Sequence, residues 1–137
     1  MSSYLIIDGY NLIYAIPSLL KASRKSIDFA RDNLISMVES YCDCYNAEGI
    51  IVYDGNQKKR TIEEGNPTTI FAKKGEGADA VIESLVYKLP DRGQARVVTD
   101  DRVVMNMVIG MGAFTMHVAV FEVEARQAIE SIRKNIQ

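Results

Sequence analysis

Aspartates stand at the ends of three apolar stretches of this sequence. Asp8 ends YLIID, Asp54 ends IIVYD, and Asp100 follows ARVVT with a second acid, Asp101, directly after it. Short apolar runs of this kind are typical of strands that are buried on both faces of a sheet. Because parallel strands end at one edge of a sheet, and ligands bind beyond that edge, we expect these carboxylates to share a site.

A fourth acid, Asp79, lies in GEGADA at the start of a predicted helix. Carboxylates that converge repel one another by roughly 4 kcal/mol per pair at about 4 Å and an effective dielectric near 20. Either bound protons or a cation must relieve this repulsion. An all-oxygen ligand set favours a hard cation, so the sequence predicts Mg²⁺ or Mn²⁺ at this edge.

A carboxylate-held ion of this type activates water and neutralises charge on a leaving oxygen, which is the chemistry of phosphodiester hydrolysis. We therefore interpret Asp8, Asp54, Asp79 and Asp100 as metal ligands. Asp8, Asp79 and Asp100 are also the candidate catalytic residues, together with Asn11, whose amide can donate to a carboxylate or a phosphate without adding negative charge.

Each of these residues also has a purely structural interpretation. An aspartate after a strand can cap the next helix or form a turn, and Asn11 can act as a cap as well. Asp79 in a first helical turn can simply favour the helix dipole. Thr99 could orient a carboxylate or be an ordinary strand residue. The sequence leaves both interpretations open.

Basic and aromatic residues near the same edge are candidates for holding a polyanion. Such basic residues could contact a phosphate backbone with little base selectivity, or they could form only a solvated surface. Tyr10 and Tyr14 could stack on bases or pack against the apolar helix. The basic substrate-binding candidates are Lys58, Lys59, Arg60, Lys73, Lys74 and Arg102.

The elements that must position these residues alternate along the chain. Helical patterns separate the apolar runs, which predicts a parallel sheet covered on both faces, a three-layer α/β/α fold. Pro17 is expected to break the first helical pattern, and Ser26 to cap a long helix. Segment 56–67 is polar and predicted as a loop. The predicted strands are 4–8, 49–54, 68–73, 95–101 and 114–120, and the closing helix is 120–136.

Two of these helices have predicted buried faces. In the long helix these are Phe29, Leu34, Met37, Val38 and Tyr41. In the closing helix they are Val123, Ala125, Ala128, Ile129 and Ile132.

Composition is that of one globular domain over residues 1–137, with 47% hydrophobic and 25% charged residues. The net charge is −2 and the pI about 5.4, so any affinity for nucleic acid must come from a local patch. Cys42 and Cys44 point apart on a helix, which makes a disulfide between them implausible. No export signal or membrane-length apolar run is present, and we expect a cytoplasmic protein.

The stretches LIIDGYNLI, IVYDG, FAKKGEGADAVIESLV and VVTDD resemble the NYN domains of the PIN-like nuclease superfamily, in particular the YacP-like proteins. The resemblance covers essentially the whole chain. It implies a five-stranded parallel sheet of order 3-2-1-4-5, an acidic pocket for Mg²⁺ or Mn²⁺, and endoribonuclease cleavage of single-stranded RNA. The implied acids are Asp8 with its companion Asn11, then Asp54, Asp79 and Asp100, with Glu83 as a peripheral member and Asp101 as an alternative to Asp100.

YacP-like relatives often continue past the final helix into a basic tail, whereas this sequence ends at Gln137. With the acidic pI as well, the resemblance leads us to expect that the ribosome, or another RNA-bearing partner, presents the substrate. The alternative is a PIN-like domain that binds RNA or a protein and cuts nothing. The clustered acids count against that alternative, because an adaptor has no physical need for negative charge facing a polyanion.

Overall fold

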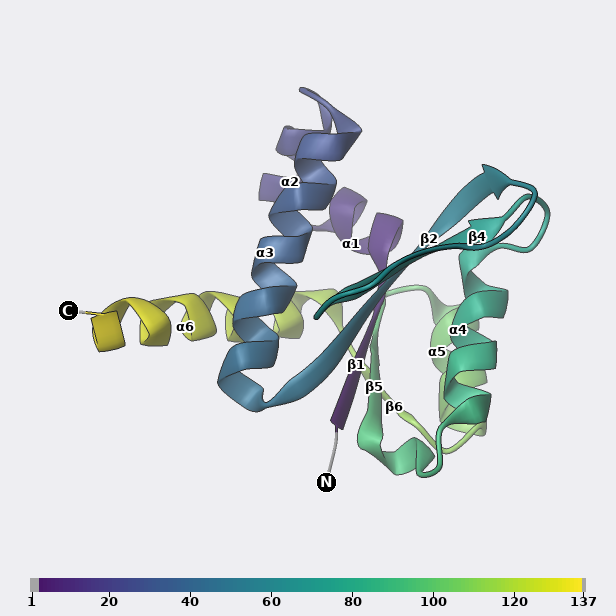
Figure 1. Ribbon diagram of the computed structural model, residues 1–137. Coiled ribbons are helices and arrows are strands. Elements are labelled where there is room, and N and C mark those ends of the chain that lie inside the picture. Colours follow the sequence, from purple (N-terminus) through teal and green to yellow (C-terminus); the bar gives the residue numbers. More distant parts are fainter. Residues whose placement is uncertain (1–2, 137) are drawn as a thin grey trace.

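A six-stranded sheet forms the middle layer of the structure, a computed structural model that describes residues 3–136 (Figure 1). The strand order is β3-β4-β2-β1-β5-β6. Five strands run parallel, and β3 runs antiparallel to β4 at one edge. The strands are β1 (Ser3–Asp8), β2 (Ala47–Gln57), β3 (Thr61–Glu63), β4 (Thr68–Lys73), β5 (Ala95–Val98) and β6 (Phe114–Met116).

The five predicted strands lie in the expected order 3-2-1-4-5, as β4-β2-β1-β5-β6, but the expected five-stranded parallel sheet is wrong, because a sixth strand pairs antiparallel at its edge. The additional strand, β3, lies in segment 56–67, which the sequence predicted as a loop. All three residues of β3 are exposed, so no apolar face marked it as a strand. β2 also continues beyond Asp54 to Gln57, which brings the chain round into this hairpin.

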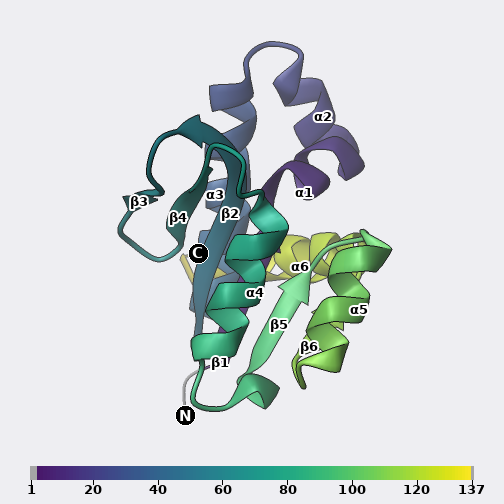
Figure 2. The same ribbon diagram turned by 90° about the vertical axis from the view of Figure 1, so that its right-hand side faces the viewer.

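Helices cover both faces of the sheet, as the sequence predicted (Figures 1 and 2). Four of them pack on one face and two on the other, with a short 3-10 turn (Arg92–Gln94) before β5. The first group is α1 (Gly9–Ala15), α2 (Pro17–Ser23), α3 (Ile27–Tyr45) and α6 (Val118–Ile136); the second is α4 (Ala78–Lys88) and α5 (Arg102–Gly110).

The pleat of the central strands divides the core between these two layers. In β1, Leu5 and Ile7 face the layer of α3 and α6, whereas Ile6 faces α4 and α5. All three are at most 2% exposed, as expected for a strand buried on both faces. The apolar run that ends at Asp8 is thus the central strand of the molecule.

The predicted start signals of the early helices are confirmed. The first helical pattern breaks at Pro17, which opens α2, because proline cannot donate within a preceding helix. Ser26 caps α3: its hydroxyl oxygen accepts a hydrogen bond of 2.9 Å from the N–H of Phe29. Cys42 is buried and Cys44 exposed, and both are free thiols.

Two details of the helix predictions are wrong. Phe29 and Val123 are 44% and 48% exposed, although both were expected in buried faces. Phe29 lies beside the buried face of α3, which Ala30 and Leu34 form, and Val123 lies between Phe121 and Ala125, which α6 buries instead. The predicted strand 114–120 ends at Met116 instead, and α6 begins at Val118, two residues earlier than expected. None of the helices within residues 3–136 has the length and apolar character needed to cross a membrane.

The glycines that follow two of the strand-end acids are required by close packing. A Cβ atom at Gly9 would lie 2.3 Å from the Tyr53 ring, and one at Gly55 would lie 2.1 Å from the carbonyl oxygen of Ala72. Such contacts are far inside van der Waals distance. Gly9 therefore lets the chain turn away from the sheet directly after Asp8, whereas Gly55 lets β2 pass close to the backbone of β4 where the register of the two strands shifts.

Gly55→Ala is expected to lower the free energy of unfolding by about 1–3 kcal/mol, because the clash is with the backbone of β4 and no side chain can move aside. Chemical denaturation measures this loss. Gly110→Ala is the matched control: a Cβ there meets nothing within 4 Å, and the change should be neutral or stabilising by about 0.5–1 kcal/mol. Equal effects of the two substitutions would contradict this account of Gly55.

Candidate active site

Asp8 ends the central strand, and its carboxylate does not serve as a helix cap. The residue occupies the N-cap position of α1 but accepts no capping hydrogen bond there. Instead, the hydroxyl of Thr99 donates to Asp8 Oδ2 over 2.9 Å. Thr99 is fully buried after β5, next to β1 in the sheet. Thr99 therefore orients the Asp8 carboxylate.

The electrostatic surroundings of Asp8 are unfavourable to its charge. Burial raises the pKa of Asp8 from 3.8 to about 6. The Thr99 hydrogen bond opposes this increase, whereas the negative charges of Asp101, Asp54 and Asp79 add to it. Each of these three carboxylates is thus near enough to act on Asp8. Asp8, Asp54, Asp79 and Asp101 form what we call the acidic cluster.

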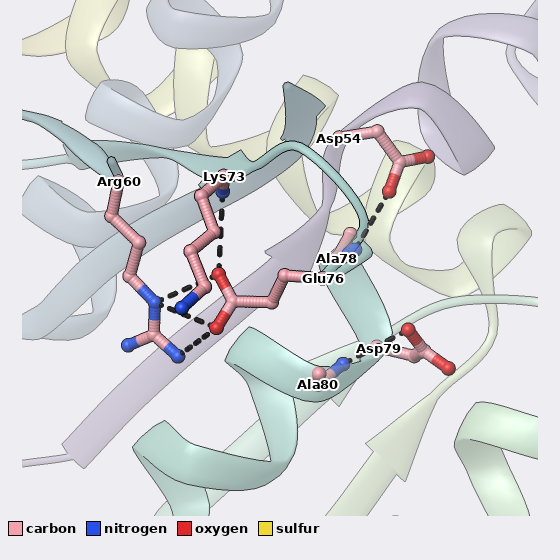
Figure 3. Close-up of polar contacts among 7 residues, drawn as sticks. All are labelled: Asp54, Arg60, Lys73, Glu76, Ala78, Asp79 and Ala80. Carbon is pink, nitrogen blue, oxygen red and sulfur yellow. Dashed lines mark hydrogen bonds and ion pairs between the residues drawn. The ribbon is translucent and has the colours of Figure 1, made fainter. Parts of the chain in front are cut away.

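Asp54 and Asp79 both lie at the start of α4, where each accepts a hydrogen bond from the helix backbone (Figure 3). The N–H of Ala78 donates to Asp54 Oδ1 over 2.7 Å, and the N–H of Ala80 donates to Asp79 Oδ1 over 2.9 Å. A Cβ built at Gly77 would lie 2.7 Å from Asp79 Oδ1 and 3.9 Å from Asp54 Oδ1, so both carboxylates border this glycine. The capping interpretation holds for Asp54, and it is compatible with membership of the acidic cluster.

The two acids after β5 point in different directions. Asp101 caps α5 by accepting from the N–H groups of Val103 and Val104, and its negative charge acts on Asp8. The carboxylate of Asp100 instead turns toward the start of α6. It accepts from the N–H of Val118 over 3.0 Å and lies 3.4 Å from His117 Nδ1. The structure therefore places Asp101, not Asp100, in the acidic cluster.

Asn11 connects the first helix to this turn. It lies within α1 and not at its N-cap, so it does not cap that helix. Its Oδ1 accepts from the N–H of Asp100 over 2.9 Å, while the N–H of Asp101 donates to the Thr99 hydroxyl over 3.0 Å. A continuous chain of bonds thus runs from Asp101 through Thr99 to Asp8.

The acidic cluster offers only carboxylate oxygens. Within residues 3–136, no three acidic, histidine or cysteine side chains converge closely enough to enclose a metal ion directly. Mg²⁺ commonly keeps several of its waters and binds one or two carboxylates, and it needs no dedicated cage. The donor chemistry therefore fits a hydrated Mg²⁺ or Mn²⁺ held by part of the cluster. The repulsion at Asp8 gives such an ion a reason to bind.

The predicted basic residues differ in whether their side chains form ion pairs. Arg60 is engaged by Glu76, with its Nε 2.9 Å from Oε1, and the pair lies on the other side of the α4 start from Asp79 (Figure 3). This hydrogen bond lowers the pKa of Glu76. The remaining candidates are solvent-exposed: Lys58, Lys59, Lys73, Lys74 and Arg102. Glu83 is exposed on α4 and Tyr14 on α1.

A cleft of about 540 Å³ opens beside Asp54, and the sequence did not predict its main cation. Arg31 of α3 lines this cleft and donates to the Tyr10 hydroxyl over 2.8 Å. An arginine within an amphipathic helix looks like an ordinary surface residue, so no signal in the sequence marked it. The contact between His117 and Asp100 was not predicted either, because the sequence marks His117 only as its single histidine.

The arrangement is that of an α/β domain whose acids gather at the carboxyl edge of a mostly parallel sheet, where such folds bind ligands. Comparison with known proteins agrees with it. Residues 5–137 match the YacP-like NYN domain, and this chain belongs to that family. The family is typically one of nucleases.

Related proteins come from Bacillus subtilis. The YacP protein of strain 168 is 32% identical over 139 residues, covering 97% of this chain and 78% of that protein. The crystal structure of Rae1 (YacP) has a TM-score of 0.83 at 28% identity and covers 99% of this chain and 80% of that chain. A mutant form of it gives 0.81, also at 28% identity, over 96% and 79%.

Asp8→Asn should change how stability depends on pH in metal-free protein. Folding raises the pKa of Asp8 to about 6, so its protonated form stabilises the fold fully below pH about 3.8, and this contribution is lost as pH rises through 6. Between pH about 4 and pH about 8, the free energy of unfolding of the wild type should therefore fall by roughly 2–3 kcal/mol more than that of Asp8→Asn, whose asparagine stays neutral. Urea denaturation across this range measures it.

Asp43→Asn, at an exposed position of α3, is the matched control and should follow the wild-type curve. If the stability of Asp8→Asn followed the wild-type dependence on pH, folding would not raise the pKa of Asp8.

Proposed function

We propose that this protein is a Mg²⁺- or Mn²⁺-dependent endoribonuclease that hydrolyses phosphodiester bonds in single-stranded RNA. The observation that carries the proposal is the coupling of Asp8, at the end of the central strand, to three further carboxylates at the same edge of the sheet. Membership of the YacP-like NYN family supports it, since the family is typically one of nucleases.

In this proposal the cluster residues have distinct tasks. The bound ion would activate water and neutralise the phosphate. Thr99 holds Asp8 in one orientation, and the unfavourable surroundings of its charge in the metal-free protein favour binding of a cation there. The N–H of Ala78 at the start of α4 holds the Asp54 carboxylate in place. Asp79 and Asp101 complete the negative field that attracts the cation.

Asp100 and Asn11 act in this scheme as positioning residues. Asn11 holds the backbone of the turn after β5, and Asp100 ties the same turn to α6. Together they fix the backbone from which the Asp101 side chain extends. Exposed Lys58, Lys59, Lys73, Lys74 and Arg102 are the proposed contacts for the RNA backbone.

We extend the proposal to the way in which RNA reaches the site. With a net charge of −2, the protein has no overall attraction for a polyanion. RNA presented by the ribosome, or by another RNA-bearing partner, would arrive at high local concentration. Binding to free RNA is then expected to be weak and strongly dependent on salt.

Purified protein should cleave single-stranded RNA when Mn²⁺ or Mg²⁺ is added and stop when the ion is chelated, and gel analysis of free and ribosome-bound RNA measures this. Asp8→Asn and Asp79→Asn should each slow cleavage by about 100-fold or more. Asp43→Asn, which removes an exposed acid elsewhere, should not.

Cleavage that survives both cluster substitutions would come from a contaminating enzyme or another site. RNA binding without any cleavage would favour the alternative, a non-catalytic RNA-binding module.

A further inference from the structure

A groove leads away from the acidic cluster along β4. The cleft beside Asp54 adjoins a second hollow of about 340 Å³, and both are lined by Arg31, Glu63 and Phe71. The helix α3 and the β3–β4 hairpin contribute to its walls. We call it the aromatic groove, and the residues that characterise it are Tyr10, Arg31, Asn56, Gln57, Glu63 and Phe71.

Aromatic rings form a rigid floor in this groove. Tyr53 is fully buried, with its ring stacked at 5.2 Å and 24° on Phe71 and at 4.7 Å from the ring of Tyr10. Tyr10 and Phe71 are themselves only partly buried. Two accessible rings are thus backed by a third that cannot move. Flat surfaces of this type stack nucleobases without regard to sequence.

Arg31 is fixed among these rings. Its guanidinium carbon lies 5.5 Å from the centre of the Phe71 ring and 5.8 Å from that of Tyr53, and its Nη1 bonds the Tyr10 hydroxyl. Only 22% of the side chain is exposed. A guanidinium held in this way adds a second planar surface on which an unpaired base can stack.

The charge of the groove argues against a phosphate as its occupant. Asp28, Asp32, Asp54 and Glu63 all line it, whereas Arg31 is the cation of the lining and is already paired with Asp28. Negative walls repel phosphate but accept hydrogen bonds from the exocyclic amino groups of bases. The amides of Asn56 and Gln57 offer both donors and acceptors to a base edge.

Tyr53 supplies an independent sign that a polar ligand belongs here. Among the described residues, its hydroxyl is the buried side-chain polar atom that lacks a hydrogen-bond partner, and the residue lines the second hollow. Buried polar groups without partners are rare in folded proteins.

From these observations we infer that the aromatic groove is a nucleobase subsite for a nucleotide next to the cleaved phosphodiester bond. The base packs among Tyr10, Phe71 and Arg31, while its phosphate lies outside the groove, toward the cation proposed for the acidic cluster. This inference rests on the proposed ribonuclease function and adds to it the part of the substrate that the groove recognises. It also explains how an acidic protein holds RNA: through bases as well as through the charged backbone.

The test combines a groove variant with abasic RNA. Phe71→Leu removes the aromatic face but keeps an apolar side chain, and Phe114→Leu makes the same change at an exposed phenylalanine on the far edge of the sheet. Binding of a fluorescent single-stranded RNA is measured in chelator, so that no cleavage occurs. A series of RNAs carries one abasic nucleotide at each position around the cleavage site, which is mapped with added Mn²⁺.

Phe71→Leu should weaken binding by about fivefold or more, and Phe114→Leu should not. An RNA with an abasic nucleotide at one position should bind wild-type protein more weakly by a similar factor. Phe71→Leu should bind that abasic RNA no more weakly than it binds intact RNA. Arg31→Lys keeps the charge but removes the planar guanidinium, and the loss that it causes should concern the same nucleotide position.

Equal binding by Phe71→Leu and Phe114→Leu, with wild-type cleavage intact, would overturn the base subsite and leave the nuclease proposal standing. The base subsite would also be overturned if the affinity losses from Phe71→Leu and from the abasic nucleotide multiplied at every position. Wild-type protein that neither binds nor cleaves RNA, free or ribosome-bound, would overturn both proposals.

Discussion

The carboxylate of Asp8 lies where the apolar core of the sheet meets its polar edge. Its neighbours Ile7, Val98 and Val52 are fully buried. The chain leaves the sheet at the next residue, Gly9, which begins α1. Holding a carboxylate there costs free energy, because burial and nearby acids both raise its pKa. One hydroxyl, that of Thr99, offsets part of the cost. A site that is unfavourable for a bare carboxylate is well prepared for a cation.

The local structures around the cluster all serve to keep the acids in place. Helices α4, α5 and α6 begin at this edge, and their first N–H groups bind Asp54, Asp101 and Asp100. The helix starts therefore fix the orientations of these three side chains. The same edge supplies the aromatic groove, since Gly9 is small enough for Tyr53 to approach and support Tyr10 and Phe71. Acids and rings are consequently parts of a single arrangement.

Much of this could be predicted from the sequence because it depends on chain topology. Parallel strands must end at one edge, so acids at the ends of apolar runs had to gather there. What could not be predicted depends on tertiary contacts. Asp100 and Asp101 are adjacent, and only the start of α6 determines that Asp100 turns away. β3 is a strand because it pairs with β4, since its own residues are all exposed. Arg31 joins the groove through packing that no local pattern encodes.

The central claim is that the acidic cluster, with Asp101 and not Asp100 as its member, binds a divalent cation. A titration of Mn²⁺ into the protein, followed by NMR line broadening, tests it most directly because the paramagnetic ion broadens only the signals near it. The account predicts saturable broadening that begins at Asp8, Asp54, Asp79 and Asp101, and a larger loss of affinity in Asp101→Asn than in Asp100→Asn. Broadening spread evenly over exposed acids such as Glu130, unchanged by Asp101→Asn, would contradict it.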